Sequence, residues 1–405
     1  MSDIFTNPFT RSLWSLNPDI AYLNHGSFGA TPKDILAHQR SIQDDLEFEP
    51  VQFMLRTMPE KLWKAQMALA GFVGAQPEDI VLMENATSAV NSIIAHLPLQ
   101  PGDEILFVDQ AYGACRKTAE FYATRAGARC RSIPLPIGLS DPQEIVEVVN
   151  AAWGPNCKLL LFDHICSPTG WILPASEIVQ FYESKGTPVL VDGAHALGQI
   201  QLDLDALGAS YYVANAHKWL CTPKGSAMLH VRKDRQATVR PLIVSHWSDW
   251  ENPTESPQYN RFQMSHAWTG TRDASAVLSI PYALEWMGRL HPEGWTGLQQ
   301  ENTRRAREFR RKLSETFNEP VLCPDAMVGH MGSMLLPPSL RIPEGGHVPI
   351  GQGLSPLWDI LYQRYNIEVV VFLFQDRPVL RFSIQPYVSD TDLDRLLGAL
   401  TELCE

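Results

Sequence analysis

The sequence predicts an α/β protein built around a wound, mainly parallel β-sheet. Between about residues 80 and 231, short apolar runs alternate with amphipathic segments, which is typical of parallel strands joined by crossover helices. The chain has 405 residues, of which 45% are hydrophobic, so one large and one smaller domain are expected. Seven runs are the expected strands: IVLM, EILFV, RCRSI, KLLLF, PVLVD, YYVA and SAMLHV.

The segments that connect these runs carry apolar residues at helical spacing. Residues 141–153 and 173–186 show this pattern and end near Gly or Pro, as crossover helices do. After residue 231 the alternation of apolar runs and amphipathic segments ends. The stretch from Pro241 to Gln263 is rich in Pro, Ser, Trp and Asn and is expected to be irregular, and a long helix is expected to begin near Ala274.

The carboxy-terminal part predicts a smaller α+β domain. Residues 295–317 form a charged helical pattern, and the runs NIEVVVFLF and PVLRFSI have the character of strands. We therefore expect a large domain over residues 19–281 and a small domain over residues 282–405 together with residues 1–18.

Composition excludes several classes of protein. The net charge of −12 argues against a nucleic-acid binder, and no apolar run reaches the length of a membrane span. The seven cysteines are scattered without a C-x-x-C spacing, and no H-E-x-x-H motif occurs, so neither disulfides nor a metal is expected. The first 20 residues lack the pattern of a secretion signal, which predicts a cytoplasmic location.

Ligands of wound sheets bind at the carboxyl ends of the strands, so residues that follow each run are the candidates for chemistry. After IVLM, Asn85 and Thr87 can cap a helix whose first N–H groups would cradle a phosphate, although an ordinary N-cap explains them equally. After EILFV, Tyr112 can cover a ligand or serve packing alone. After KLLLF, Ser167 and Thr169 lie in a predicted turn.

An acid and an amine follow the next two runs. Asp192 directly ends an apolar strand, where a carboxylate needs a cation or N–H partner, unless it only caps the following turn with His195 beside it. Lys218 follows YYVA, and a lysine in an apolar pocket loses its proton readily and becomes a nucleophile toward an aldehyde. A surface lysine is the alternative for Lys218 taken alone.

Together these strand ends fit pyridoxal 5'-phosphate. This aldehyde cofactor needs a lysine amine, a carboxylate facing its ring nitrogen, and donors for its phosphate. Asp192 would keep the ring nitrogen protonated, and Lys218 would move the proton of the substrate α-carbon. No strand is followed by G-x-G-x-x-G, so a dinucleotide-binding dehydrogenase is disfavoured.

An ordered series of motifs spans nearly the whole chain. It consists of YLNHGSFGATP (22–32), NATSAVN (85–91), DHICSPTG (163–170), VDGAHALGQ (191–199), NAHKWLCTPKG (215–225), WTGTRD (268–273) and LRFSIQPYVSDTDLDRL (380–396). In these motifs the chain resembles the class V aminotransferases of the fold-type I pyridoxal phosphate enzymes, and within them the isopenicillin N epimerase-like branch, which is related to cysteine desulfurases and carbon–sulfur lyases.

The resemblance implies a mainly parallel seven-stranded large domain, a smaller α+β domain and a homodimer with shared active sites. It implies Lys218, Asp192 and Tyr112 as catalytic residues, with the cofactor also held by a set of side chains that would include one from the second subunit: Ala86, Thr87, His195, Asn215, His217 and, across the dimer, Thr271. It implies that Arg381 binds the substrate carboxylate and that Asn24, His25 and Gly26 line the entrance.

The chain departs from the resemblance in three places. Ser167 stands at the turn where cysteine desulfurases carry an asparagine, so no role is carried over to it. Asn215 stands where many relatives carry Ser or Thr before the lysine, yet it can still donate to phosphate. Cysteine desulfurases carry a nucleophilic cysteine shortly before the carboxylate-binding arginine, and the run NIEVVVFLFQDRPVLR contains none, so a persulfide mechanism is disfavoured.

Three reactions of an amino acid remain open: epimerisation at the α-carbon, cleavage of a carbon–sulfur bond, and transamination. The resemblance favours the epimerase, with the lyase close behind it. Tyr112 or His25 could supply the second base of an epimerase. A non-catalytic scaffold that binds the cofactor is disfavoured because Lys218, Asp192 and Arg381 are all present.

Overall fold

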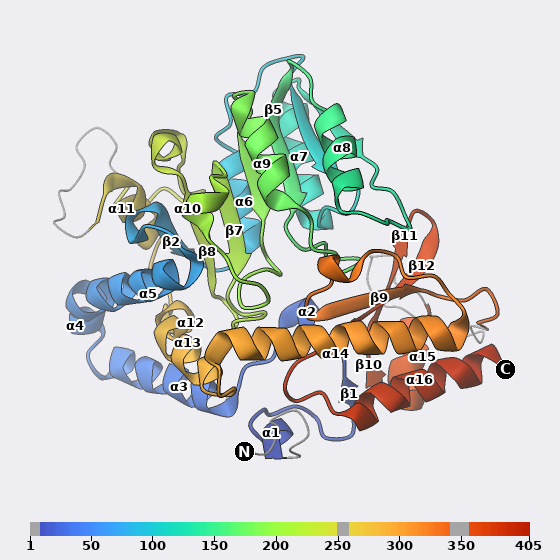
Figure 1. Cartoon of the computed structure of the whole chain (residues 1–405). Helices are drawn as coiled ribbons and strands as arrows, with labels where there is room; N and C mark the ends of the chain where they lie inside the picture. Colours follow the sequence, from blue (N-terminus) through green and yellow to red (C-terminus); the bar gives the residue numbers. More distant parts are fainter. Residues whose placement is uncertain (1–8, 249–258, 341–355) are drawn as a thin grey trace.

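The computed structural model describes residues 9–248, 259–340 and 356–405, and its largest element is a seven-stranded sheet (Figure 1). The strand order is β2-β8-β7-β6-β5-β3-β4. The strands from β7 to β4 pair in parallel, whereas β8 is antiparallel to both β7 and β2. The bounds are β2 (Ile80–Met83), β3 (Glu104–Val108), β4 (Arg129–Ile133), β5 (Cys157–Asp163), β6 (Val189–Asp192), β7 (Tyr211–Asn215) and β8 (Ala227–Val231). The predicted α/β class and mainly parallel seven-stranded sheet are confirmed.

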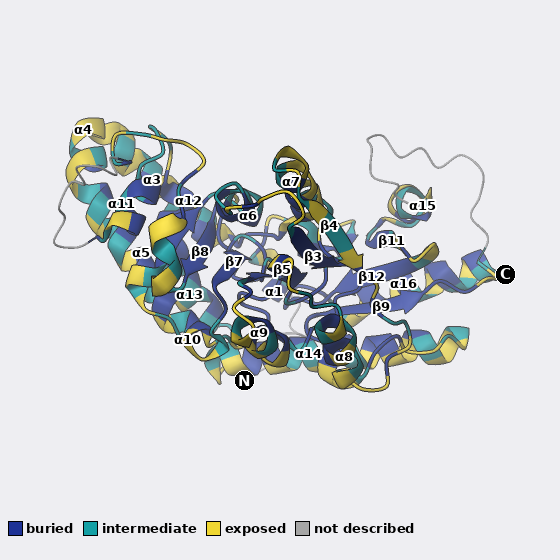
Figure 2. Ribbon diagram, turned by 90° about the horizontal axis from the view of Figure 1, so that it is seen from above, coloured by how far each residue is buried: buried dark blue, intermediate teal, exposed yellow. Residues whose placement is uncertain are grey.

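Helices cover both faces of this sheet. In Figure 2, α6 (Ala86–Ile94) and α7 (Gly113–Arg125) lie on one face, and α8 (Gln143–Ala151) and α9 (Ala175–Ser184) lie on the other. Central strands such as β6 and β7 are therefore buried along their whole length, which explains why they read as continuous apolar runs. The edge strand β4 is partly exposed and carries Arg129 and Arg131, charges that discourage pairing with another chain.

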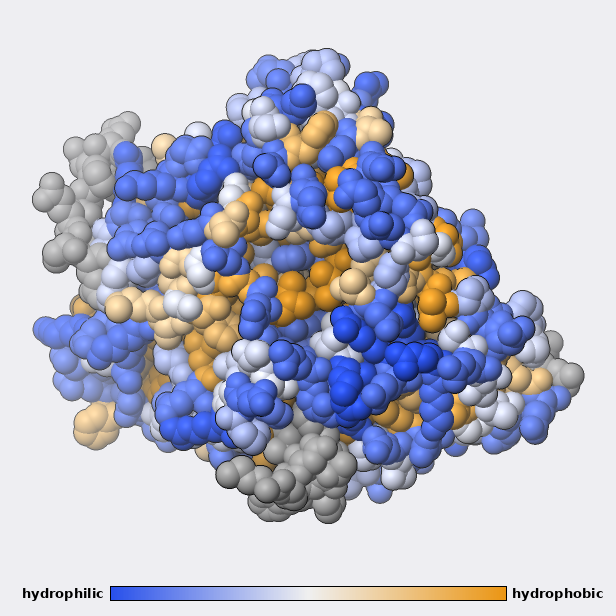
Figure 3. Space-filling view, viewed as in Figure 1, coloured by the Kyte–Doolittle hydropathy of each residue, from blue (hydrophilic) through white to orange (hydrophobic). Residues whose placement is uncertain are grey.

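The second sheet has three antiparallel strands in the order β11-β12-β9, with β9 (Met331–Leu335), β11 (Val370–Phe374) and β12 (Arg377–Ser383). The long helix α14 (Gly294–Phe317) packs on β9 with Phe309 and Leu313 among its buried residues. Its outer side is polar, and strongly hydrophilic side chains gather over it on the face shown in Figure 3. Helices α15 (Pro356–Tyr365) and α16 (Asp390–Cys404) complete this part (Figure 1).

A two-stranded parallel pair joins the amino-terminal segment to the carboxy-terminal part. β1 (Ala21–Tyr22) pairs with β10 (Ile367–Glu368), and the backbone N–H of Ser383 donates to the carbonyl oxygen of Leu23 at 2.8 Å. The domain boundaries expected from the sequence stay a prediction.

The remaining helices are short or lie on the amino-terminal side of the large sheet. They are α1 (Phe9–Ser12), α2 (His25–Phe28), α3 (Lys33–Phe48), α4 (Pro50–Gln52), the π-helical turn η1 (Phe53–Thr57), α5 (Met58–Val73), η2 (Pro77–Asp79), α10 (Leu204–Leu207), η3 (Lys233–Thr238), α11 (Arg261–Ala267), α12 (Ser275–Leu278), α13 (Ile280–Gly288) and η4 (Asp325–Met327). Among the described helices, none combines the length and apolarity needed to cross a bilayer.

Two local expectations were wrong. The long helix expected near Ala274 is divided into α12 and α13, with Ser279 between them and a proline in the first turn of α13. The stretch expected to be irregular up to Gln263 already contains the start of α11, because Asn260 and Gln263 form a reciprocal capping box. Residues 249–258 of that stretch lie outside the described residues.

We predict that Gly29→Ala is strongly destabilising. Gly29 has φ +69° and ψ 168°, and an added Cβ would collide with the carbonyl oxygen of His217 and lie 3.0 Å from Lys218 Cα. The free energy of unfolding should fall by about 3 kcal/mol or more, measured by urea denaturation.

The matched control is Gly102→Ala. Gly102 also has a positive φ of +93°, but no atom lies within 4 Å of an added Cβ. Only backbone strain of about 1–2 kcal/mol is expected there. Equal losses in the two variants would contradict the close approach of Gly29 to the Lys218 backbone.

Candidate active site

A pocket opens at the carboxyl ends of the central strands. Ten of the candidate residues named from the sequence line it together: Asn85, Ala86, Thr87, Tyr112, Ser167, Asp192, His195, Asn215, His217 and Lys218. They come from the ends of β2, β3, β5, β6 and β7 and from the turns that follow, so the sheet itself brings them together.

Lys218 is the buried centre of this pocket. Its Nζ lies 3.2 Å from Nε2 of His195, and the indole N–H of Trp219 donates to Nδ1 of the same imidazole at 3.2 Å. Burial lowers the pKa of His195 well below its usual value, so the ring is neutral. Because Nδ1 accepts the indole N–H, the ring proton sits on Nε2 and points at Lys218. This arrangement suits a neutral amine.

The surroundings of Lys218 favour that neutral form. Burial, and secondly the positive charge of Arg381, lower the pKa of the amine from 10.5 to about 8. Asp192 and Asp163 act in the opposite direction. A lysine amine with this pKa can both accept and return a proton near neutral pH.

Asp192 lies at the end of β6 with little cationic compensation. Its carboxylate accepts hydrogen bonds from the Ala194 N–H at 3.0 Å and the Cys115 thiol at 3.2 Å. No Lys, Arg or His nitrogen of the described residues lies within 4.0 Å to form an ion pair with it. A buried carboxylate of this kind is stabilised when a cationic ligand group is placed against it.

A second carboxylate accompanies Asp192. Asp163 ends the adjacent strand β5 in register with Asp192 and is equally buried. Burial, and secondly the charge of Asp192, raise the pKa of Asp163 well above its usual value, and burial raises the pKa of Asp192 as well. The two carboxyl groups therefore titrate as a pair, and a cationic ligand group placed against Asp192 favours ionisation of that residue.

The amino end of α6 supplies donors on the other side of the pocket. Asn85 caps the helix by accepting the Ser88 N–H at 2.8 Å, as its position predicts, and Asn215 accepts the Ala86 N–H at 2.9 Å. The Thr87 N–H has no acceptor among the described residues. This N–H and the Thr87 hydroxyl are free to bind an anion at the helix terminus.

His217 offers a further hydrogen-bonding group in the pocket. Its Nδ1 lies 3.0 Å from the carbonyl oxygen of Ser226, and burial lowers its pKa to about 4. The neutral ring therefore carries its proton on Nδ1, and Nε2 is left as an acceptor. Among the described residues Nε2 has no partner, and it would bind a phosphate oxygen that carries a proton.

Arg381 lies in β12, is fully buried and does not itself line the pocket, but its guanidinium contacts Ser27 and Ser167, which do. Its guanidinium donates to the Ser167 carbonyl oxygen and to Asn24 Oδ1 at 3.2 Å, while Nε has no partner among the described residues. Burial lowers its pKa to about 9. No carboxylate of the described chain forms an ion pair with it, so a substrate carboxylate can take that place.

The segment expected at the entrance takes a different position. His25 is fully buried: one ring nitrogen lies 2.8 Å from the Tyr387 hydroxyl and the other 2.9 Å from the Lys218 carbonyl oxygen. It therefore lies behind Lys218 rather than at the entrance. Asn24 is also buried beside Arg381, whereas Ser27 and Phe28 line the pocket. Gly26 does not line the pocket either: an added Cβ would lie 2.8 Å from the sulfur of Met331 and 3.4 Å from His195 Cε1.

Thr271 does not line the pocket of its own chain and is exposed. Sequence reasoning missed three residues of the site: Asp163, Cys115 and Trp219. Asp163 carries the same signal as Asp192, an acid directly after an apolar run, whereas Cys115 and Trp219 act through contacts that only the fold creates.

These residues fit the predicted cofactor. The pocket combines a buried amine at Lys218, a carboxylate at Asp192 without an ionic partner in the described chain, and an unused N–H at Thr87. Tyr112, 43% exposed, supplies an aromatic ring at the mouth. An amine, an anion and a phosphate donor are the three functions that pyridoxal phosphate needs.

We predict that Lys218→Met stabilises the cofactor-free protein at pH 7 by on the order of 2–3 kcal/mol. The folded-state pKa of Lys218 lies below that of the unfolded chain. The unfolded chain therefore binds more protons between about pH 8 and pH 10.5, and wild-type stability rises through that window. The difference between wild type and Lys218→Met should shrink over the same window, measured by urea denaturation. Lys117→Met, on the exposed side of α7, is the control and should change stability by less than about 0.5 kcal/mol at either pH.

Known proteins share both sequence and fold with this chain. The aminotransferase class-V family profile matches residues 52–318. Isopenicillin N epimerase of Amycolatopsis lactamdurans is 35% identical over 97% of each chain, and a probable chloroplastic L-cysteine desulfhydrase of Arabidopsis thaliana is 28% identical over 96% of this chain and 83% of its own. A solved structure of C-DES, a cystine C–S lyase, superposes with a TM-score of 0.81 at 20% identity over 97% of this chain and 99% of its own. The chain therefore belongs to the class-V aminotransferase family and is a pyridoxal phosphate-dependent enzyme.

Proposed function

We propose that this enzyme epimerises the α-carbon of an amino-acid substrate, in the manner of the isopenicillin N epimerases that it resembles over its full length. The observation that carries the proposal is a pair of buried groups, the Lys218 amine and the Arg381 guanidinium. Arg381 lowers the pKa of Lys218, so the two groups share one electrostatic environment. An amino acid offers its carboxylate to Arg381 and its α-proton to Lys218.

The chain's own residues hold the reacting groups and move the proton. When bound, pyridoxal phosphate supplies an aldehyde for amines and a ring that takes up the electron pair released at the α-carbon. Asp192 stabilises a protonated ring nitrogen, and Thr87 and His217 hold the phosphate. Lys218 removes the α-proton at Nζ, with His195 and Trp219 fixing the position of that amine.

Arg381 sets the class of substrate. Its buried guanidinium can form two parallel hydrogen bonds with a carboxylate, which gains strength because water is excluded. Asn24 Oδ1 and the Ser167 carbonyl oxygen orient the guanidinium from the side. The substrate is therefore an α-amino acid or a molecule that presents one.

Epimerisation also needs a proton donor on the face opposite Lys218. Tyr112 is the better of the two candidates, because its hydroxyl has no hydrogen-bond partner among the described residues and its side chain lines the pocket. Burial, and secondly Cys115 and Asp192, raise its pKa, which keeps the phenol protonated. His25 has both ring nitrogens engaged and is buried behind Lys218.

Cleavage of a carbon–sulfur bond in a cysteine derivative is the second candidate. It begins with the same removal of the α-proton, and relatives named L-cysteine desulfhydrase support it. The described part of β11 and β12 carries no cysteine before Arg381, so a persulfide route on the enzyme remains disfavoured. Transamination and a non-catalytic scaffold rank below both.

A homodimer belongs to this proposal, with Thr271 of one subunit completing the phosphate site of the other. Its support is that Thr271 is exposed and away from the pocket of its own chain. Phe28, at the pocket mouth, is 72% exposed and is an apolar surface that a second subunit could cover. A cytoplasmic location stays a prediction.

We predict that the holoenzyme exchanges the α-proton of isopenicillin N or a simpler L-amino acid with D₂O and inverts the centre without releasing pyruvate, ammonia or sulfide. Chiral chromatography and deuterium incorporation by mass spectrometry measure this. Pyruvate and sulfide from L-cysteine would select the lyase instead.

Arg381→Lys should reduce kcat/KM about 100-fold or more, since a single ammonium cannot reproduce the two-pronged contact.

We predict that Tyr112→Phe lowers the epimerisation rate about 100-fold and leaves α-proton exchange of one enantiomer close to wild type. The ring is retained, so cofactor binding should persist and can be checked by the visible absorbance. His25→Gln is the comparison and should affect stability more than stereochemistry. Full inversion by Tyr112→Phe would remove Tyr112 from this role.

A further inference from the structure

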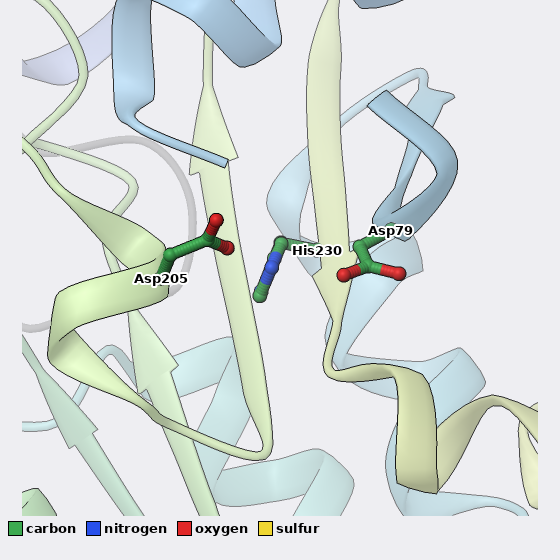
Figure 4. A group of neighbouring side chains, drawn as sticks. All are labelled: Asp79, Asp205 and His230. Atoms are coloured by element: carbon green, nitrogen blue, oxygen red, sulfur yellow. The ribbon is translucent and has the colours of Figure 1, made fainter. Parts of the chain in front are cut away.

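A second polar cluster lies at the far edge of the large sheet, away from the pocket. It consists of Asp79 at the end of η2, Asp205 in α10 and His230 in β8. In Figure 4 the imidazole of His230 lies between the two carboxylates. Asp79 precedes β2, whereas the active-site residues follow the other end of that strand, so the two sites lie at opposite ends of β2.

His230 is the unusual member of this cluster. Its side chain is only 3% exposed, yet neither ring nitrogen has a hydrogen-bond partner among the described residues. Buried imidazoles normally satisfy at least one nitrogen, because an unpaired polar group in the interior costs about 1–3 kcal/mol. Burial also lowers the pKa of His230 to about 4, despite the opposing effect of Asp205. The ring is therefore neutral and offers a lone pair.

The two carboxylates are held in place by amides from neighbouring segments. Gln236 donates to Asp79 Oδ1 at 2.7 Å, and Gln76 donates to Asp205 Oδ2 at 2.9 Å. Burial raises the pKa of Asp79, the hydrogen bond from Gln236 opposes this, and the charges of Asp205 and Glu78 add to the rise. The two carboxylates and one nitrogen of the neutral imidazole thus face one another as acceptors, while the other ring nitrogen carries the proton. A cation is a partner that satisfies these three acceptors.

The dimensions suit a metal ion. One ligand atom from each residue lies within 4.8 Å of the other two. A point among three such atoms is at most about 2.8 Å from each, compared with about 2.0–2.2 Å for zinc bound to nitrogen or carboxylate oxygen. Asp205 is exposed and Asp79 is half-buried, so small rotations of these two side chains can close that difference.

We infer that Asp79, Asp205 and His230 form a binding site for one divalent transition metal ion of the Zn²⁺ class. The imidazole nitrogen favours such an ion over Mg²⁺ or Ca²⁺, which prefer oxygen ligands alone. Three protein ligands leave coordination positions for water on the exposed side of Asp205. The ion would join η2, α10 and β8, segments far apart in the sequence, and so stabilise the β2 edge of the sheet.

The test is calorimetric titration of the chelator-treated, desalted holoenzyme with ZnCl₂, and separately with MgCl₂. The wild type is expected to bind one Zn²⁺ per chain at a saturable site and to gain thermal stability when zinc is present. His230→Phe should weaken zinc binding about 100-fold. Asp205→Asn should weaken it about tenfold or more. MgCl₂ should give no comparable signal.

Glu78→Gln is the matched control, because Glu78 neighbours Asp79 in the same turn but is not part of the cluster. It should bind zinc as the wild type does. His230→Phe loses no hydrogen bond of the described chain, so its metal-free stability should be unchanged or higher. If it fails to fold, the exposed Asp205→Asn variant decides the question. Equal zinc affinity in the wild type and Asp205→Asn, or no saturable binding, would overturn the inference.

Discussion

The burial of a single amine, that of Lys218, is the constraint on which the rest of the site depends. An ammonium group in the interior is costly, and the protein meets that cost by placing the residue where the charge can be given up. The neighbouring imidazole is fixed by the Trp219 indole in the tautomer that suits a neutral amine. The backbone around Lys218 is also closely packed. Gly29 lies against the backbone of His217 and Lys218, and Gly198 lies against the backbone carbonyl of Trp219. Glycine is required at both places because each has a positive φ and no room for a Cβ.

Two further charged groups are buried on either side of this amine without an ionic partner in the described chain. Asp192 relies on a backbone N–H and a thiol, and Arg381 relies on oxygen atoms of neutral groups. Neither arrangement repays the loss of hydration, so both groups destabilise the protein until ligands meet them. Asp192 and Arg381, whose burial lowers the stability of the protein, are therefore the residues at which cofactor and substrate are proposed to bind.

Much of the fold could be predicted because its signals are local. The runs IVLM and EILFV became β2 and β3 with unchanged bounds, since buried strands must be continuously apolar. The site residues that could be predicted are those that directly follow an apolar strand, such as Asp192 and Lys218, because the carboxyl ends of the strands of a wound sheet form its binding site. What depends on long-range packing could not be predicted: the turn of His25 away from the pocket toward Tyr387, the pairing of Asp163 with Asp192, and the division of the helix after Ala274. The cluster of Asp79, Asp205 and His230 is of the same kind, since no spacing rule joins residues so far apart.

The pairing of β1 with β10 has a consequence for how the enzyme is made. The segment from Asn24 to Phe28, which closes the pocket against Arg381, is held in place by strands that lie in the last 40 residues of the chain. During synthesis the parallel sheet can form while this segment still lacks its partner strand. β10 and Ser383 must therefore leave the ribosome before the amino-terminal segment can dock on them.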